Sequence, residues 1–198
     1  MIKHPSRPRK GLKSAVEMDV SVHKILKGSR ANGPGIRNVV WFQGCTLQCP
    51  GCFNPDTHDP ASSHKISVTD LCSSLLEPKC DGVTISGGEP FQQPEALFQL
   101  LTSLRKNNIQ SILLFSGYPY DVLRTASFSK TSLPLIDVLI CGPYRKDLPP
   151  AYDRFCSSSN QELILLSDRY TTEDFCDLPL SEIIITPEGE TVMSGICL

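Results

Sequence analysis

The segment GCTLQCPGCFN, residues 44–54, contains three cysteines in the spacing C-x3-C-x2-C. Cys45, Cys49 and Cys52 therefore offer three thiolates within one short loop. Iron-sulfur clusters are held by cysteine thiolates, usually one for each iron, so three close cysteines leave one iron of a four-iron cluster without a protein ligand. An iron of that kind is free to bind a substrate or cofactor directly.

A zinc site is the alternative for these cysteines, with His58 as the fourth ligand. Structural zinc sites usually combine two pairs of ligands, and the chain has no second C-x2-C pair, so the spacing favours the cluster. The other six cysteines are isolated, and we expect each to be a small buried apolar residue, with one of them available as a hidden fourth ligand. They are Cys72, Cys80, Cys141, Cys156, Cys176 and Cys197.

Length and charge limit the remaining possibilities. With 198 residues, 40% of them hydrophobic, the chain can bury the core of one domain, which we expect at residues 18–198. The 19 basic and 21 acidic residues give a net charge of −2, which predicts no general attraction to nucleic acid or to a membrane surface.

The first 17 residues differ in composition from the rest. They are basic up to Glu17, and Pro5 and Pro8 interrupt any amphipathic helix, so we expect a poorly ordered tail, with an organelle transit peptide as the alternative. No apolar run reaches the roughly 18 residues that span a bilayer. A cytoplasmic location is therefore expected.

Strand-like and helix-like segments alternate along the chain. Helices are expected at 68–76, with Thr69 as the N-terminal cap, at 94–106 and at 120–125. Strands are expected at 18–24, 36–43, 82–86, 111–115, 138–140 and 163–166, and a hairpin at 182–186 and 190–193 with its turn at 187–189. This alternation predicts an α/β fold with a mostly parallel sheet, whose ligands bind at the carboxyl ends of the strands.

A second motif, SGGEP at residues 86–90, follows the expected strand at 82–86. Gly87 and Gly88 have no side chains to keep a ligand away from the backbone, and the carboxylate of Glu89 can receive an ammonium group. Gly-Gly-Glu-Pro is also ordinary turn chemistry, so the motif gains its interest from lying after a strand and downstream of the cysteine loop.

Together the two motifs resemble those of the radical S-adenosylmethionine (SAM) superfamily. The resemblance implies that Cys45, Cys49 and Cys52 hold a 4Fe-4S cluster, and that the open iron chelates the methionine part of SAM. It also implies that Gly87, Gly88 and Glu89 hold the amino group of that methionine. Ser116 and Asn54 are further candidates for polar contacts to the cofactor.

Within the superfamily, the sequence is most similar to the activating enzymes of glycyl radical proteins, in particular of anaerobic ribonucleotide reductase. These enzymes resemble partial, open β/α barrels with helices outside. The matching segments span nearly the whole chain and are residues 32–37, 41–45, 49–57, 116–118, 137–144 and 158–161.

The resemblance implies reductive cleavage of SAM to a 5'-deoxyadenosyl radical, which takes hydrogen from a glycine of the partner protein. It implies two partners, the large subunit of anaerobic ribonucleotide reductase and a flavodoxin or ferredoxin-type electron donor. Cys141 and Cys156-Ser157 depart from the family pattern, in which an aspartate and an arginine-glycine pair are usual. These departures leave the partner surface open, although they do not touch cluster ligation.

Two other functions remain open on the sequence alone. One is a radical SAM enzyme of the same architecture that acts on another peptide or on a small molecule. The other is an iron-sulfur electron carrier without turnover, which would not need Glu89. Trp41 and Phe42 are expected in the core, Arg37 at the surface or the rim of the site, and His23 and His64 as ordinary histidines.

Overall fold

The computed structural model describes residues 18–185, 189 and 191–196. Its helices are α1 (Val68–Leu76), α2 (Pro94–Lys106) and α3 (Tyr120–Leu123). Its strands are β1 (Asp19–Ser29), β2 (Arg37–Phe42), β3 (His64–Ser67), β4 (Gly82–Gly87), β5 (Ile112–Ser116), β6 (Val138–Cys141), β7 (Glu162–Leu165), β8 (Ser181–Ile185) and β9 (Thr191–Gly195). Seven strands form one sheet in the order β3-β1-β2-β4-β5-β6-β7, and β8 and β9 form a second, two-stranded sheet.

The centre of the main sheet is parallel. Strands β2, β4, β5 and β6 run in the same direction, because a crossover containing α1, α2 or α3 separates each from the next. The flanking strands β1, β3 and β7 are antiparallel to their neighbours. The predicted α/β class is confirmed, with the sheet open because β3 and β7 end the strand order without pairing to each other.

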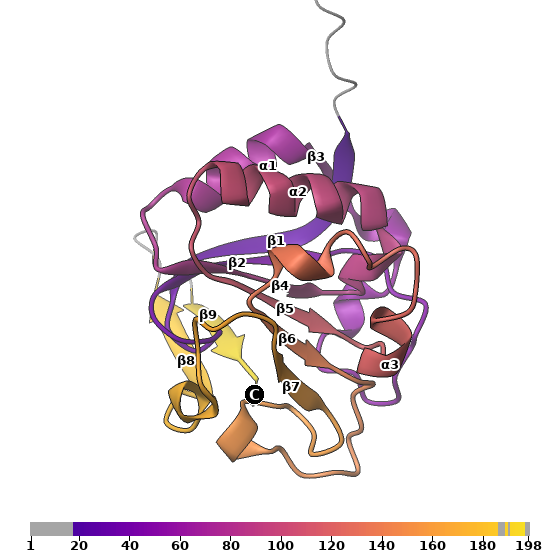
Figure 1. Ribbon diagram of the computed structural model, residues 1–198, viewed down its shortest axis with the longest axis vertical. Coiled ribbons are helices and arrows are strands. Elements are labelled where there is room, and N and C mark those ends of the chain that lie inside the picture. Colours follow the sequence, from indigo (N-terminus) through magenta and orange to yellow (C-terminus); the bar gives the residue numbers. More distant parts are fainter. Residues whose placement is uncertain (1–17, 186–188, 190, 197–198) are drawn as a thin grey trace, which may run out of the picture.

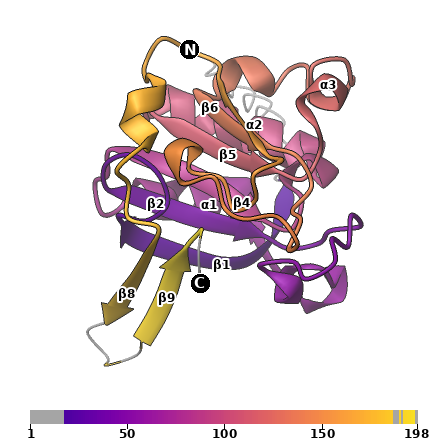
Figure 2. The same ribbon diagram turned by 90° about the horizontal axis from the view of Figure 1, so that it is seen from below.

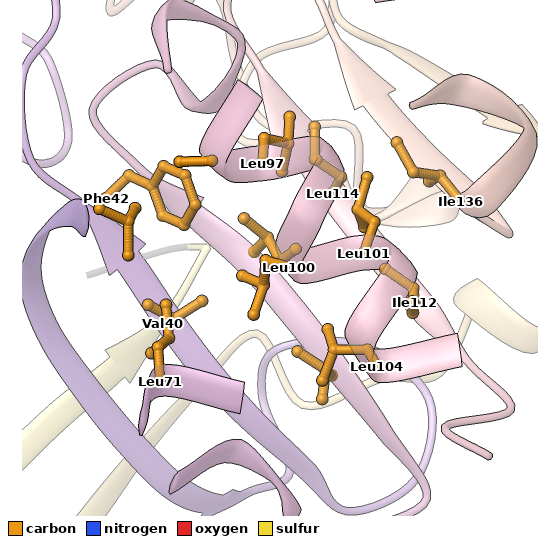
Figure 3. Packing of buried hydrophobic residues seen from close by; sticks show 14 of the residues in the cluster. Val40, Phe42, Leu71, Leu97, Leu100, Leu101, Leu104, Ile112, Leu114 and Ile136 are labelled. Atoms are coloured by element: carbon orange, nitrogen blue, oxygen red, sulfur yellow. The ribbon is translucent and has the colours of Figure 1, made fainter. Parts of the chain in front are cut away.

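Helices α1 and α2 lie side by side on one face of the sheet (Figure 1). The side chains that α2 turns toward the sheet recur at helical spacing and are almost fully buried, whereas Phe98 on its other side is 38% exposed. Figure 3 shows the leucines of α2 against side chains of β2, β5 and α1. The buried residues of α2 are Ala96, Leu97, Leu100, Leu101 and Leu104.

The expected hairpin at the end of the chain forms as β8 and β9, although residues 187 and 188 of its turn lie outside the described residues. It covers part of the other face of the main sheet, where Ile184 and Val192 pack against a cluster that includes Trp41. Figure 2 shows the far end of the hairpin projecting away from the main sheet. Alternation along β8 and β9 leaves the opposite side chains exposed, among them Ile183 at 65%.

The start of α1 corrects one prediction. Ser67, not Thr69, is the N-terminal cap, because its side chain accepts a hydrogen bond from the backbone N–H of Asp70. Ser67 has an extended backbone since it ends β3, which pairs with β1 up to Asp19. Strand β3 itself escaped prediction, because HKIS is short and lacks a clear apolar alternation.

Arg37 was expected at the surface or the rim of the site, and this prediction is wrong. The side chain is completely buried at the start of β2, at the opposite end of the strand from the cysteine loop. Its guanidinium donates hydrogen bonds to Thr84 Oγ1 (2.6 Å), Ser111 Oγ (3.0 Å) and the Val83 carbonyl (2.7 Å). Arg37 therefore ties together β2, β4 and the segment before β5, as a buried polar group requires. Trp41 and Phe42 lie in the core as predicted.

Within the described residues, no helix is both long enough and apolar enough to cross a bilayer. The basic tail expected at residues 1–17 lies outside the described residues. The division into a tail and a single domain at residues 18–198 stays a prediction.

Candidate functional site

A cavity lies at the carboxyl ends of the parallel strands, as predicted for the sheet. It encloses about 100 Å³ and is partly open to solvent. This is less than the roughly 300 Å³ of ordinary ligand pockets, so the cavity encloses the floor of a site and not a whole cofactor. The residues that line it after β2, β4, β5 and β6 include Cys45, Cys49, Cys52, Asn54, Gly87, Gly88, Glu89, Ser116, Gly117 and Gly142.

The cysteine loop is a tight excursion after β2. Its backbone turns back at Gln48 and Gly51, which have φ values of +47° and +72°, and the N–H of Cys52 donates to the Cys49 carbonyl at 3.0 Å. Glycine suits position 51 because of its left-handed conformation, and a Cβ there would in addition require the exposed side chain of Lys146 to move aside. The loop brings all three thiols to the same cavity.

The three thiols lie in a partly buried environment. Burial raises the pKa of Cys45, while backbone hydrogen bonds from Leu47 and Gln48 lower it and the charges of Glu89 and Cys49 raise it further. Burial also raises the pKa of Cys52, against backbone hydrogen bonds from Asn54 and Phe53. Because a raised pKa disfavours the thiolate, the loop gains most from a positively charged metal centre that stabilises it.

The three thiols can be compared with the ligand geometry of zinc and of a four-iron cluster. In the described part of the chain, no three His, Cys, Asp or Glu side chains converge closely enough to hold one metal ion. A zinc ion with Zn–S bonds of about 2.3 Å would draw its sulfurs to within about 3.8 Å of one another. A four-iron cluster binds each cysteine at a different iron, so its ligands are more widely spaced. The three cysteines line one cavity, which is compatible with a cluster, and zinc is still disfavoured by the absence of a second C-x2-C pair in the sequence.

The second motif is joined directly to the cysteine loop. The N–H of Gly88 donates to the Phe42 carbonyl at 2.8 Å, and the N–H of Glu89 donates to the Gly44 carbonyl at 3.0 Å. A Cβ at Gly87 would lie 2.3 Å from Phe42 N, and one at Gly88 would lie 2.2 Å from Gly44 O. The two glycines therefore do more than leave room for a ligand, since they let the end of β4 touch the loop.

Glu89 links this motif to the next strand. Its side chain is fully buried, and its carboxylate accepts hydrogen bonds from the backbone N–H groups of Phe91 (3.0 Å) and Gly117 (2.7 Å). It also accepts from the Ser116 hydroxyl, whose oxygen lies 3.0 Å and 3.1 Å from the two carboxylate oxygens. Burial raises the pKa of Glu89 to about 7, although these hydrogen bonds act to lower it. A direct contact with a ligand's ammonium group stays a prediction, because the described contacts already engage both carboxylate oxygens.

Ser116 and Asn54 both line the cavity, but they differ in the hydrogen bonds of their side chains. The Ser116 hydroxyl donates to Glu89 and accepts from Tyr118 N at 3.1 Å, so it is part of the wall. The side-chain amide of Asn54 has no hydrogen-bond partner among the described residues, while the Asn54 carbonyl accepts from Thr57. Asn54 is therefore the more available of the two for a ligand.

Several residues of the site escaped prediction. Gln43 is 1% exposed at the end of β2, and its amide donates to the carbonyls of Asp56 (2.8 Å) and Asp59 (2.7 Å). Gln161 donates to the Gly142 carbonyl at 3.1 Å, and the ring of Tyr144 meets Phe53 edge-on at 5.7 Å. Gln43 carried a local signal in the sequence, as a polar residue that follows an apolar strand just before the cysteines, whereas Phe53, Tyr144 and Gln161 were marked only by lying in segments that carry the resemblance.

Of the remaining cysteines, none that the structure describes lines the cavity. Cys72, Cys141 and Cys156 are buried as predicted, but Cys176 is exposed and Cys80 is only partly buried. Cys197 lies outside the described residues. Burial raises the pKa of Cys141 to about 12 and of Cys156 to about 11, so both stay protonated thiols at neutral pH.

Comparison with known proteins agrees with this site. The model of a family described as a 4Fe-4S single cluster domain matches residues 31–164, about two thirds of the chain. The chain therefore belongs to the family of 4Fe-4S single-cluster domains.

Its relatives include three pyruvate formate-lyase-activating enzymes. The enzyme of Clostridium pasteurianum is 37% identical over 123 residues, which are 59% of this chain and 51% of that protein. Those of Staphylococcus epidermidis and Staphylococcus aureus (strain USA300) are each 34% identical, over 101 and 99 residues, 46% of this chain and 39% of each protein. The chain thus spans about half the length of these relatives, or less.

Among solved structures, QueE from Escherichia coli superimposes with a TM-score of 0.44 and 17% identity, covering 50% of this chain and 52% of that one. The chain is thus a 4Fe-4S single-cluster domain that is homologous to pyruvate formate-lyase-activating enzymes over the matched segments. Its cofactor is accordingly a 4Fe-4S cluster.

Gly88→Ala tests the contact between the two motifs. The new Cβ would lie 2.2 Å from Gly44 O, so the cysteine loop must move by about 1 Å to restore ordinary contact. We expect the iron bound after anaerobic reconstitution, measured with the sulfide content, to fall several-fold. Gly28→Ala is the control, because no atom lies within 4 Å of its Cβ, although its φ of +71° is itself unfavourable for alanine. Equal iron content in the two variants would contradict the prediction.

Glu89→Gln tests the buried carboxyl through the pH dependence of stability. The folded chain holds the Glu89 proton up to about pH 7, whereas the unfolded chain loses it near 4.5. Folded protein therefore binds more protons between these values, so its stability falls as pH rises from about 4.5 to 7 and then levels off. Glutamine does not ionise.

The free energy of unfolding is measured in urea, on protein without a loaded cluster. Between pH 4.5 and 8, it should fall by about 3 kcal/mol more in the wild type than in Glu89→Gln. Parallel pH profiles for the two proteins would show that the Glu89 carboxyl has an ordinary pKa in the folded chain.

Proposed function

We propose that this chain is a radical SAM enzyme that activates a glycyl radical enzyme. The observation that carries the proposal is the direct hydrogen bonding between the cysteine loop and the Gly87-Gly88-Glu89 strand end at one cavity. An electron carrier has no use for a second motif held against its cluster loop. A radical SAM enzyme needs both, because SAM must touch the open iron and the protein at once.

In this proposal, different residues of the chain hold the cluster, position SAM and fix the cavity wall. Cys45, Cys49 and Cys52 would each hold one iron, and the charge of the metal would offset the raised pKa values of the Cys45 and Cys52 thiols. Asn54 and the backbone at Gly88 position the methionine part of SAM. Glu89, through Ser116 and the Gly117 N–H, keeps the ends of β4 and β5 at a constant separation. When bound, the cluster and SAM would supply one-electron cleavage of a carbon-sulfur bond.

The cavity is partly open to solvent, which a macromolecular substrate requires, because a peptide loop of the partner must reach the bound cofactor. We propose the large subunit of anaerobic ribonucleotide reductase as the partner, on the strength of the resemblance around residues 32–57, and a flavodoxin or ferredoxin-type protein as the electron donor. A cytoplasmic location follows from these partners. Membrane and nucleic acid have no part in the proposal.

Pyruvate formate-lyase is the second candidate partner. The relatives of 34–37% identity are named for activating that enzyme, which is the specific observation in its favour. The catalytic groups would be the same for both partners. Only the surface around the cavity mouth would differ.

The activity is tested by 5'-deoxyadenosine formation. The anaerobically reconstituted, reduced protein should produce 5'-deoxyadenosine from SAM, and Cys49→Ala should lower the rate at least a hundredfold because one iron loses its ligand. Cys176→Ala is the matched control, since Cys176 is exposed and does not line the cavity. A wild-type cluster that is reduced but never cleaves SAM would favour the electron carrier.

The partner is tested by electron paramagnetic resonance (EPR). The reduced protein with SAM is incubated with the reductase large subunit or with pyruvate formate-lyase, and the glycyl radical signal is counted per partner chain. We expect a signal with the reductase that disappears when its radical glycine is replaced by alanine. A signal only with pyruvate formate-lyase would transfer the proposal to the second candidate.

A further inference from the structure

His58 lies beside the first cysteine of the loop because two hydrogen bonds join the strand end to the turn at Pro55–Thr57. The N–H of Gly44 donates to the Thr57 carbonyl at 2.7 Å, and the N–H of Cys45 donates to the His58 carbonyl at 3.1 Å. The buried Gln43 amide also binds the carbonyls of Asp56 and Asp59. The backbone of His58 is therefore held in register with Cys45.

The imidazole of His58 lines the same cavity as the three cysteines. Its Nε2 atom is buried and has no hydrogen-bond partner among the described residues. Two other buried side-chain atoms share this state, the hydroxyls of Thr102 and Ser132, but neither residue lines the cavity. A buried, unsatisfied polar group costs about 1–3 kcal/mol, so Nε2 is expected to have a partner in the working protein.

The hydrogen-bond acceptors around the cavity indicate which group can be the partner of His58 Nε2. The two oxygens of Glu89 are engaged by Ser116, Gly117 and Phe91. The thiolate of Cys45 and the sulfides of a cluster bound there are acceptors, and backbone groups of Leu47 and Gln48 already donate toward Cys45. Donors around cluster sulfurs are a recognised means of adjusting the reduction potential.

We propose that His58 donates a hydrogen bond from Nε2 to a sulfur at the Cys45 corner of the cluster and thereby raises the cluster's reduction potential. The proposal rests on the cluster described above, not on turnover. Reduction adds negative charge to the cluster, and a donor stabilises the more negative state. His58 is thus a positioning and tuning residue, and not the fourth ligand of a zinc site. Donation requires the tautomer that carries its proton on Nε2.

The test measures the potential of the cluster directly. Wild type, His58→Phe and His58→Gln are reconstituted anaerobically, and the reduced cluster is quantified by EPR during a potentiometric titration without SAM. Phenylalanine keeps the ring but removes the donor, whereas glutamine keeps an N–H donor. His64→Phe is the matched control, since His64 is an exposed histidine outside the cavity.

At a fixed potential, His58→Phe should lower the ratio of reduced to oxidised cluster about tenfold, which is about 59 mV for one electron. His58→Gln and His64→Phe should stay near the wild type. An equal fall of this ratio in the phenylalanine and glutamine variants would overturn the proposal, because the shape of the side chain, and not its N–H donor, would then set the potential.

An unchanged potential in His58→Phe with weaker SAM binding, measured by equilibrium dialysis, would also overturn it, since Nε2 would then bind SAM. The titration needs no cleavage of SAM, so its outcome is independent of the 5'-deoxyadenosine assay that tests the proposed function.

Discussion

The site depends on the contact between the end of β4 and the loop that follows β2. Two backbone hydrogen bonds, from Gly88 N to Phe42 O and from Glu89 N to Gly44 O, continue the parallel pairing of the two strands beyond their last residues. Gly87 and Gly88 permit this approach because any side chain would overlap the backbone of Phe42 or Gly44. The contact fixes the position of Gly44, the residue before Cys45, and hence the position of the cysteine loop relative to the sheet.

A second set of contacts extends this arrangement to the neighbouring strand. The buried carboxyl of Glu89 reaches the backbone and hydroxyl groups at the end of β5, so the ends of three adjacent strands are joined through one residue. A charged carboxylate is costly to bury, which is why its pKa rises despite several donors. Glu89 is therefore first a structural group of the cavity wall. Its charge also acts on the metal site, because it raises the pKa of the Cys45 thiol.

Local sequence signals predicted the regular elements well where propensity and packing agree. Helix α2 has the predicted bounds because Pro94 suits a first turn and its leucines recur at helical spacing. The cap of α1 could not be chosen this way, since both Ser67 and Thr69 are good caps. The pairing of β3 with β1 decides the matter by keeping Ser67 extended. Strand β3 and the burial of Arg37 likewise depend on partners distant in sequence.

The sequence alone indicated a metal centre, because three cysteines at this spacing lie in one short loop, and it placed Gly87 and Gly88 at the end of a strand. Tertiary structure decided what those glycines contact, where Glu89 directs its carboxylate, and that His58 faces the cysteine cavity with a free nitrogen. Spacing along the chain can specify a ligand set within one loop. Contacts between strand ends depend on how the sheet brings distant segments together, and no local pattern encodes that approach.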